Sequence, residues 1–517
     1  MRRSLPPVLF TAIACLTFLV NASATTYYIA ANGSDNNSGT SQSAPWAHLP
    51  GMRTWSGSHT PSAGDTFILR GCDVWGNANF PINWSGSGTS GSPITVTVDK
   101  TWFNTASCSQ WNRPVFDAGN AAISGPWVTF NGNFVEFHWI EFRNYFWNNA
   151  SPQIFLIGGG FDNITIDNAY VHHWTHGSSA VDTDNMLFKP NGSPAGRNST
   201  LSNSVIDNTD GDGATCTTMI GGTTCSGGGV SVGFILNNVF RGMPTMAKGG
   251  VGSNGMQQIV GNYFCCAGED IWSSQANHPN YIESIVGGGT LIIANNYMEI
   301  NGIGEAMQVG NSNETDIIFN NVINVTGGST CGNGGCNGPQ VPQSGSSNWN
   351  YLFFNNTVAN WVGCVILGGH GTSVVNYTFS NNHCINSGGT TEGGGLSPSG
   401  TVNRQNNLGM TMSAASSQGY TASENYAFAP PSGCTSSTCS TVGAGASIGS
   451  MFPAGFSTND TQYGCSEKSV NGVVQSFCPA RTTSARSGSW SIGAYEVSSG
   501  SSPSAPAPPT GLSATVN

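Results

Sequence analysis

The chain has 517 residues, of which only 8% are charged, while 70 are glycine and 38% are hydrophobic. Long helices draw on Ala, Leu, Glu, Lys and Arg, so this composition argues against a mainly helical protein and favours strands and turns. With 26 acidic against 15 basic residues, the chain also lacks the basic surface that binding to nucleic acid requires.

The first 24 residues have the features of an export signal. Arg2 and Arg3 precede the apolar stretch "VLFTAIACLTFLV", and the small residues Ala22 and Ala24 follow it. We therefore expect cleavage after Ala24 and a secreted or cell-surface protein. No later stretch reaches about 18 consecutive apolar residues, so we expect no membrane span.

The cysteines predict disulfides. Without Cys15, which lies in the signal, fourteen remain, an even number in an exported chain. Several are close in sequence, although spacing does not fix their connectivity: Cys216 and Cys225, Cys331 and Cys336, Cys434 and Cys439, Cys465 and Cys478.

A short pattern recurs through the middle of the chain. In "LIIANNYMEI" (291–300) and "DIIFNNVINV" (316–325), an apolar run, a pair of asparagines and a second apolar run follow one another. The polar residue just before the second run marks each copy, with steps of 24 to 36 residues: Asn168, Ser204, Asn238, Asn262, Asn296, Asn321, Asn356, Asn382 and Asn407.

A repeat of this period predicts a solenoid. The unit consists of two short strands joined by a corner at which Asn tolerates the left-handed conformation. Stacked in register, the asparagine amides can bond to their copies one turn away. We predict an all-β, single-stranded parallel β-helix with an Asn ladder over residues 25–497. The longer steps contain insertions, which in solenoids gather on one face, often the binding face.

Two segments carry a family resemblance. "TYYIAANGSDNNSGTSQSAPWAHL" (26–49) resembles the entry segment of secreted right-handed parallel β-helix proteins of the pectate-lyase-like superfamily, and "WSIGAYE" (490–496) resembles their closing turn. This resemblance implies a right-handed β-helix. It implies no single chemistry, because the superfamily includes lyases, hydrolases, epimerases and adhesins. Residues 498–517 form a Ser/Pro-rich linker and a short tail that resembles the first strand of a fibronectin type III-like module.

Ionisable residues are rare, and seven of them follow the markers of five successive copies by similar offsets. In a solenoid equal offsets stack, so these residues are expected to line one groove over residues ~170 to 310. They are His176, Asp210, Asp212, Lys248, Glu269, Asp270 and Glu305.

This set of residues suits β-elimination from a uronic acid, in which a base removes the proton next to a carboxylate. Lys248 would be the base and Arg241 would hold the substrate carboxylate. Asp210, Asp212 and Asp270 could bind Ca²⁺, which prefers carboxylate and carbonyl oxygens. The loop "DNTDGDG" (207–213) is equally compatible with an ordinary solvated turn.

Hydrolysis is the alternative reaction, because two carboxylates that flank a glycosidic bond can cleave it. The candidates for this pair are Asp210, Asp212, Glu269, Asp270 and Glu305. A non-catalytic glycan-binding surface protein is the third possibility. In each case we expect a monomer whose partner is a polysaccharide.

Aromatic and histidine residues near the groove suggest sugar contacts. Trp174 and Trp272 could stack on sugar rings, and packing in the core or capping it is an equal alternative for both. His176 is a further candidate for substrate binding. The segment "HHWTH" (172–176) also suggests a metal site, although we favour a structural or sugar-stacking role for it. In an extended strand, however, His172 and Trp174 share one face and His173 takes the other, so the imidazoles converge only if the segment turns.

Overall fold

The structure is a computed structural model. It describes residues 24–123, 125–147, 153–176, 186–192, 197–208, 229–242, 247–249, 256–265, 280–284, 288–300, 305–310, 312–325, 337–341, 347–361, 364–367, 373–386, 392–393, 400–422, 428–461, 465–478 and 483–497. The predicted signal peptide, apart from its last residue, and the predicted C-terminal tail lie outside these ranges.

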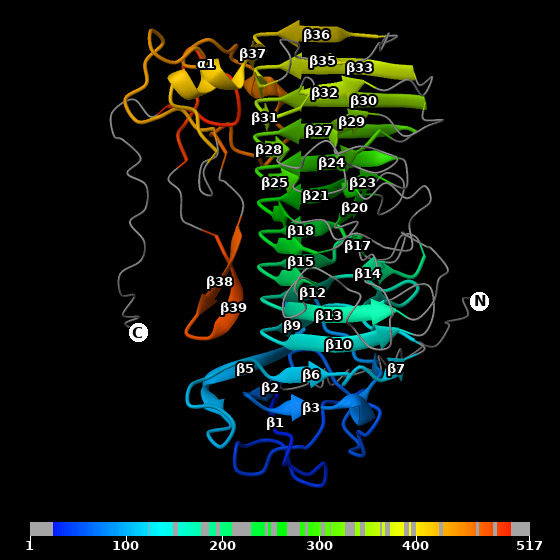
Figure 1. Cartoon of the computed structure of the whole chain (residues 1–517). Helices are drawn as coiled ribbons and strands as arrows, with labels where there is room; N and C mark the ends of the chain where they lie inside the picture. The colour runs from blue at the N-terminus through cyan, green and yellow to red at the C-terminus, as the bar shows by residue number, and fades with distance from the viewer. Residues whose placement is uncertain are drawn as a thin grey trace, which may run out of the picture.

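Three long parallel sheets form the molecule, and each turn of the chain adds one strand to sheet A, then sheet C, then sheet B (Figure 1). Sheet A contains β1 (Thr26–Ile29), β2 (Thr66–Gly71), β5 (Ile94–Phe103), β9 (Val135–His138), β12 (Ile164–Asp167), β15 (Thr200–Ser202), β18 (Phe234–Leu236), β21 (Met256–Val260), β24 (Gly289–Ala294), β27 (Glu314–Phe319), β30 (Ser347–Phe354), β33 (Ser373–Ser380) and β36 (Val402–Gln405).

Sheet C contains β3 (Val74–Trp75), β6 (Val115–Asp117), β7 (Ala122–Ile123), β10 (Glu141–Trp147), β13 (Tyr170–His176), β16 (Val205–Asp207), β19 (Val239–Arg241), β22 (Tyr263–Cys265), β25 (Tyr297–Ile300), β28 (Val322–Val325), β31 (Thr357–Ala359), β34 (His383–Ile385) and β37 (Leu408–Met410). Sheet B contains β4 (Ile82–Trp84), β8 (Val128–Phe130), β11 (Phe155–Ile157), β14 (Met186–Pro190), β17 (Gly229–Val230), β20 (Ala247–Gly249), β23 (Asn280–Ser284), β26 (Glu305–Gln308), β29 (Asn337–Val341), β32 (Val365–Leu367) and β35 (Glu392–Gly393).

This architecture confirms the predicted parallel β-helix, with one difference. The repeating unit has three strands rather than two, because a short strand of sheet B completes each turn. Within the described part of the chain, no helix has the length and hydrophobicity needed to cross a membrane.

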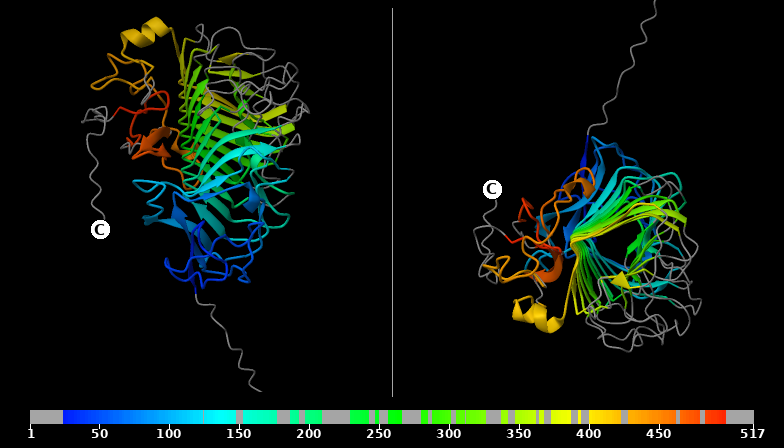
Figure 2. Two further views of the ribbon diagram at one scale, coloured as in Figure 1. Left: turned by 60° about the horizontal axis from the view of Figure 1, so that its bottom comes forward. Right: turned by 90° about the horizontal axis from the view of Figure 1, so that it is seen from above.

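The interior of the β-helix is a continuous apolar core. Since side chains alternate across a strand, every second residue of each sheet points inward and stacks on its copies in neighbouring turns. Phe353 and Phe379 stack in this way, with ring centroids 5.9 Å apart, and Tyr351 lies 6.1 Å from Tyr377. Viewed along the axis, the sheets enclose this core, while the C-terminal region lies outside them (Figure 2).

The paired asparagines have two different roles at the corner between sheets A and C. The first of each pair adopts the left-handed conformation, as Asn320 (φ 56°) and Asn355 (φ 52°) do. The second forms the predicted ladder. The Asn356 Oδ1 atom accepts hydrogen bonds from the backbone N–H and the side-chain amide of Asn321, both at 3.0 Å.

The ladder explains why the motif repeats so regularly. It runs from Ser204 through Asn238 to Asn407, and most of its side chains are fully buried. A buried amide without partners would destabilise the fold, so each turn requires the next. One marker is displaced by a residue: Asn168 is the left-handed corner residue (φ 51°), and Ala169 occupies the ladder position.

The C-terminal region docks against the outside of this corner. It contains α1 (Met412–Ser417), the 3₁₀ turn η3 (Gly449–Met451) and an antiparallel hairpin of β38 (Ser466–Val470) and β39 (Val473–Phe477). A further 3₁₀ turn, η1 (Asn77–Asn79), lies near the start of the solenoid. The corner residue Asn381 bonds to both backbone polar groups of Ala446, and the Asn320 amide donates to the Asn459 carbonyl. The outer faces of sheets A and C beside the corner are therefore covered.

Disulfides connect both cysteine pairs of this region, Cys434–Cys439 and Cys465–Cys478. Cys72–Cys108 and Cys364–Cys384 are also bonded. The remaining close pairs, Cys216/Cys225 and Cys331/Cys336, lie outside the described residues.

Candidate functional site

The predicted groove residues fall into two groups. Asp210, Asp212, Glu269, Asp270 and Trp272 lie outside the described residues, so the predicted calcium site stays a prediction. For His176, Lys248 and Glu305 the structure describes the backbone. His176 ends β13 of sheet C, whereas Lys248 in β20 and Glu305 in β26 belong to sheet B.

The register of sheet B places Lys248 in a column of polar residues. Its backbone pairs with Glu283 in β23, and Glu283 pairs with Gln308 in β26. On the other side, Ala247 pairs with Val230, so the adjacent column position belongs to Ser231. The next position in the column is Lys189 in β14, because its neighbour Phe188 pairs with Val230.

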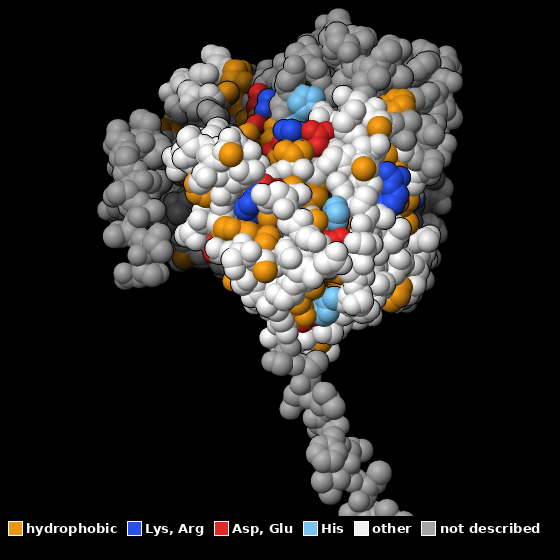
Figure 3. All heavy atoms as spheres, turned by 90° about the horizontal axis from the view of Figure 1, so that it is seen from below, with side chains coloured by type: hydrophobic (Ala, Val, Ile, Leu, Met, Phe, Trp, Pro, Cys, Tyr) orange, Lys and Arg blue, Asp and Glu red, His pale blue; other side chains and the backbone are white. Residues whose placement is uncertain are grey.

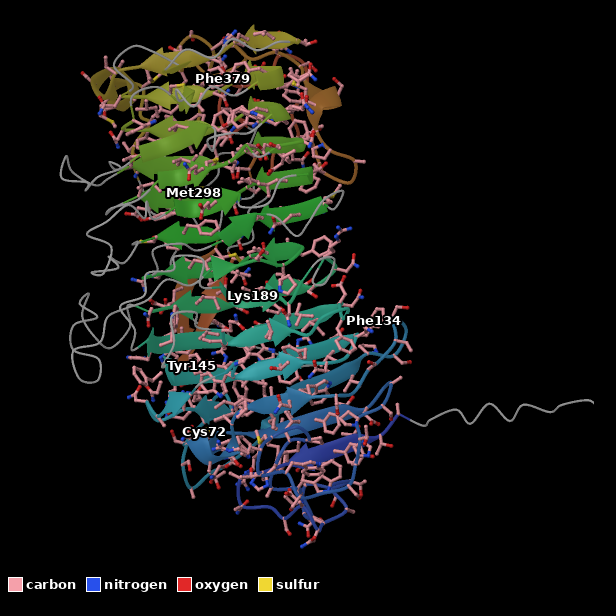
Figure 4. The ribbon with its side chains drawn as sticks, turned by 90° about the vertical axis from the view of Figure 1, so that its right-hand side faces the viewer. Cys72, Phe134, Tyr145, Lys189, Met298 and Phe379 are labelled. Carbon is pink, nitrogen blue, oxygen red and sulfur yellow. A yellow bond between two sulfur atoms is a disulfide. The ribbon has the colours of Figure 1, made fainter. Side chains whose placement is uncertain are left out.

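The described members of this column lie on the outer face of the sheet. Phe188 and Ile282, which precede Lys189 and Glu283 along their strands, are buried in the core, and alternation turns the polar residues outward. Figure 4 shows Lys189 about midway along the solenoid, between Tyr145 and Met298. Glu283 is only 8% exposed, so this polar face is sheltered.

Lys189, Glu283 and Gln308 were not among the residues predicted from the sequence. Each directly follows a core residue, in "FK", "IE" and "MQ". These dipeptides can be recognised as equivalent positions only when a third strand is assigned to every turn.

Of the two roles expected for Trp174, the structure supports packing in the core and contradicts sugar stacking. Its side chain is completely buried in the core, and its ring cannot stack on a sugar. Asn208 of the next turn bonds to both backbone polar groups of Trp174, at 3.0 and 3.1 Å. The residue stabilises the solenoid from within.

The prediction for Arg241 is wrong as well. Arg241 lies on the outer face of sheet C, where its Nη1 atom donates to Asp207 at 3.0 Å and to Glu467 of the hairpin at 3.1 Å. Both carboxylates belong to the protein, and the hairpin packs over this face. Arg241 therefore fastens the hairpin and does not lie in the sheet B column with Lys248.

The cluster of Arg241, Asp207 and Glu467 changes the pKa of one of its carboxyl groups. Burial, followed by the hydrogen bond and the negative charge of Asp207, raises the pKa of Glu467 to about 7, against the opposing effect of Arg241. One guanidinium cannot neutralise two carboxylates, so a proton on Glu467 relieves the excess charge.

Charge is sparse elsewhere on the molecule. The end of the solenoid formed by its first turns shows small groups of charged side chains among neutral and apolar ones (Figure 3). Among the described residues, no group of three or more His, Cys, Asp or Glu side chains is arranged to hold a metal ion.

Comparison with known proteins gives structural neighbours only. The sequence matches no protein-family model and no curated protein. The chain is similar in structure to a GH136 lacto-N-biosidase from Eubacterium ramulus, with a TM-score of 0.45, 11% identity, and coverage of 75% of this chain and 68% of that one.

Two similar structures are named as lyases. A rhamnogalacturonan lyase has a TM-score of 0.35 and 12% identity over 74% of this chain and 87% of its own. A variant of a PL6 family alginate lyase has a TM-score of 0.42 and 13% identity over 73% of this chain and 54% of its own. Similarity at this level carries no information about which residues act.

Proposed function

We propose that the protein binds a uronic-acid-containing polysaccharide across the strands of sheet B and cleaves it by β-elimination. Lys248 would be the general base. The observation that carries the proposal is the register of sheet B, which lines up Lys189, Ser231, Lys248, Glu283 and Gln308 in one polar column.

The column suits an extended glycan that runs along the solenoid axis. Neighbouring strands lie about 4.8 Å apart, so Lys189 and Lys248, two strands apart, are separated by roughly 10 Å. Among the described side chains, those of Lys189 and Gln308 are half-buried and could meet a glycan in this position, whereas those of Ser231 and Glu283 are buried beneath it. The net charge of −13 after signal removal gives no general attraction for an acidic chain, so recognition would depend on these local contacts.

The chemistry assigns a separate role to each lysine. Neutral Lys248 takes the proton next to the uronate carboxylate, the C–H electrons form the C=C bond, and the glycosidic oxygen leaves with its bonding electrons and gains a proton. The Lys189 ammonium would offset the carboxylate charge of a neighbouring sugar. Calcium bound by Asp210, Asp212 and Asp270 would do the same at the reacting sugar.

The test uses the protein without its signal and a panel of acidic and neutral polysaccharides, with and without calcium. Absorbance at 235 nm follows the unsaturated product of elimination, and an assay for reducing ends runs in parallel. We expect absorbance to rise with one polyuronide and to fall at least about a hundredfold in Lys248→Ala, in line with loss of a general base.

Lys468→Ala is the matched control. Lys468 lies on the hairpin, with its Nζ atom 4.3 Å from the centroid of the Phe477 ring, away from sheet B. Its removal should leave the rate unchanged. Equal activity in Lys248→Ala and Lys468→Ala would refute the assigned base.

Hydrolysis is the second candidate, because Glu283 and Glu305 both belong to sheet B. Reducing ends without absorbance, lost in Glu283→Gln or Glu305→Gln, would establish it. Binding without either signal would make the protein a glycan-binding surface protein.

A further inference from the structure

The polar column of sheet B continues toward the first turns of the solenoid. Leu156 in β11 pairs with Lys189 on one side and with Thr129 in β8 on the other. Thr129 in turn pairs with Asn83 in β4. The neighbours of Asn83, Thr129 and Leu156 along their strands are buried in the core, so alternation turns these three side chains outward. Asn83 is exposed, and the other two are half-buried.

A second outward row runs beside this one, two residues further along the strands. The backbone N–H groups of Asn131, Gly158 and Asn191 each donate to a carbonyl of the preceding strand, so these residues occupy equivalent positions. Asn131 and Asn191 are exposed. A β-carbon on Gly158 would contact the Asn131 Oδ1 atom and lie 3.2 Å from the Phe161 Cδ2 atom. The Asn131 amide and the half-buried Phe161 ring therefore lie side by side above Gly158, on the outer face.

These two rows form a surface that we call the neutral strip. It consists of Asn83, Thr129, Asn131, Leu156, Phe161 and Asn191. Among the described residues, no hydrogen bond holds the side-chain amides of Asn83, Asn131 or Asn191. An amide donates to one sugar hydroxyl while it accepts from another, and an aromatic ring packs on the apolar face of a sugar. The strip therefore offers contacts to a sugar that carries no charge.

The neutral strip is poorly suited to a row of carboxylates. Its four strands, β4, β8, β11 and β14, contain one charged residue, Lys189, at the end nearest Lys248. Neighbouring strands lie about 4.8 Å apart, close to the length of one sugar unit in an extended glycan, so the four strands span about 14 Å. A chain of uronic acids alone would bring a carboxylate to every turn, and Lys189 could offset one of them. The others would lose water without gaining a cation.

We propose that the neutral strip binds neutral sugars that adjoin the cleaved uronic acid, so that the substrate is a mixed polyuronide in which uronic acids and neutral sugars alternate. The inference rests on the proposed function, because it assigns the uronate to Lys189 and Lys248. The glycan then continues toward the first turns of the solenoid, over Leu156, Thr129 and Asn83.

The experiment measures binding rather than cleavage. It uses calorimetry with the chain without its signal and with Lys248→Ala, so that bound sugars stay intact. The probes are hexasaccharides in which a uronic acid alternates with a neutral sugar, each compared with the uniform hexamer of that uronic acid. One alternating hexasaccharide should bind at least about tenfold more tightly than its uniform counterpart. Asn131→Ala and Asn191→Ala should each weaken its binding about fivefold, as the loss of one hydrogen bond does.

Leu156→Lys tests the physical reason for this preference. The substitution adds a second cation to the strip beside Lys189, so it should strengthen binding of the uniform hexamer about threefold and leave the alternating one no better bound. Val470→Lys is the matched control, because Val470 is exposed on β38 of the C-terminal hairpin and gains the same charge there. It should not change the binding of either hexamer.

The outcomes separate this inference from the proposed function. Preferential binding of an alternating hexasaccharide, without any absorbance at 235 nm from the parent protein, would support the neutral strip and refute elimination. Tighter binding of the uniform hexamers together with that absorbance would overturn the neutral strip and leave elimination in place. Failure of both kinds of hexasaccharide to bind would also overturn the inference.

Discussion

Replacing Glu467 with glutamine should remove a pH dependence from the docking of the C-terminal hairpin. The raised pKa of Glu467, about 7 against an ordinary 4.5, means that the docked hairpin favours the protonated carboxyl. The stabilisation is therefore fully present below about pH 4.5 and is lost as the pH rises through about 7. At neutral and alkaline pH, the Glu467 and Asp207 carboxylates are both negatively charged and repel each other beside the single charge of Arg241.

The size of the effect follows from the shift in pKa. The difference between a pKa of 4.5 and one of about 7 corresponds to about 3.4 kcal/mol at most. The Glu467 side chain is 20% exposed, and water reduces its interaction with Asp207, so we expect about 1–2 kcal/mol. The Glu467→Gln substitution keeps the size of the side chain and makes it neutral at every pH, so the variant should dock equally well across the range.

Several other ionisable groups surround this cluster, and the assay has to separate their titration from that of Glu467. They are His172 on β13, in register with Asp207, Tyr263 on β22, Glu299 on β25 and Lys468 on the hairpin. The Glu467→Gln variant retains all of them, so only the difference between the two proteins reports on Glu467.

Hydrogen exchange is the suitable assay, because Cys465–Cys478 and the solenoid keep the chain folded while the hairpin opens locally. Protection of the β38 and β39 amides, corrected for the intrinsic pH dependence of exchange, should fall about tenfold between pH 5 and pH 8.5 in the parent protein. It should stay nearly constant in Glu467→Gln, while Lys189→Ala, a change of charge on β14 of sheet B, should behave like the parent. An equal fall in Glu467→Gln would refute the reasoning.

Three further predictions concern the core. Asn356→Ala should lower the free energy of unfolding by about 2–4 kcal/mol, because the Asn321 backbone N–H and the Ile318 carbonyl lose their bonds to the Asn356 side chain, whereas exposed Asn36→Ala should have little effect in the same denaturant titration. Asp316 is buried against Glu314, and burial followed by that neighbouring charge raises its pKa well above the usual range; stability should therefore fall with rising pH, and Asp316→Asn should flatten this dependence in unfolding curves at pH 6 and 9. Trp174→Ala should cost about 3–5 kcal/mol in thermal unfolding and leave any sugar affinity of the remaining folded protein unchanged.

The sequence was sufficient to predict the solenoid because one chemical need recurs at every turn. A buried amide such as Asn321 requires a partner from the copies above and below, so the chain repeats the residue at each corner. The described strands of sheet B contain no residue that has to be repeated at every turn in this way. Strand β17 consists of Gly229 and Val230 alone, and a two-residue strand leaves no periodic signal.

The candidate site was harder to predict for a different reason. The chemistry of elimination led us to assign Arg241 to the same site as Lys248, which lies seven residues further on. The structure separates them, because Arg241 belongs to sheet C and Lys248 to sheet B. The contact that decides the role of Arg241 comes from Glu467, 226 residues away, through a hairpin that folds back over the corner. The residues near Arg241 in the sequence give no indication that a hairpin so far along the chain packs against it.

The paired asparagines explain both the docking of the C-terminal region and the location of the candidate site. The second residue of each pair holds the solenoid together, and the first presents its side chain to the outside of the corner, where Asn320, Asn381 and Asn406 bond to the C-terminal backbone. One repeated dipeptide thus builds the solenoid and also fastens the C-terminal region over sheets A and C. The corner is committed to this internal contact, so the polysaccharide of our proposal is expected elsewhere. The polar column on the outer face of sheet B, on the side of the solenoid away from the corner, is the surface to which the proposal assigns it.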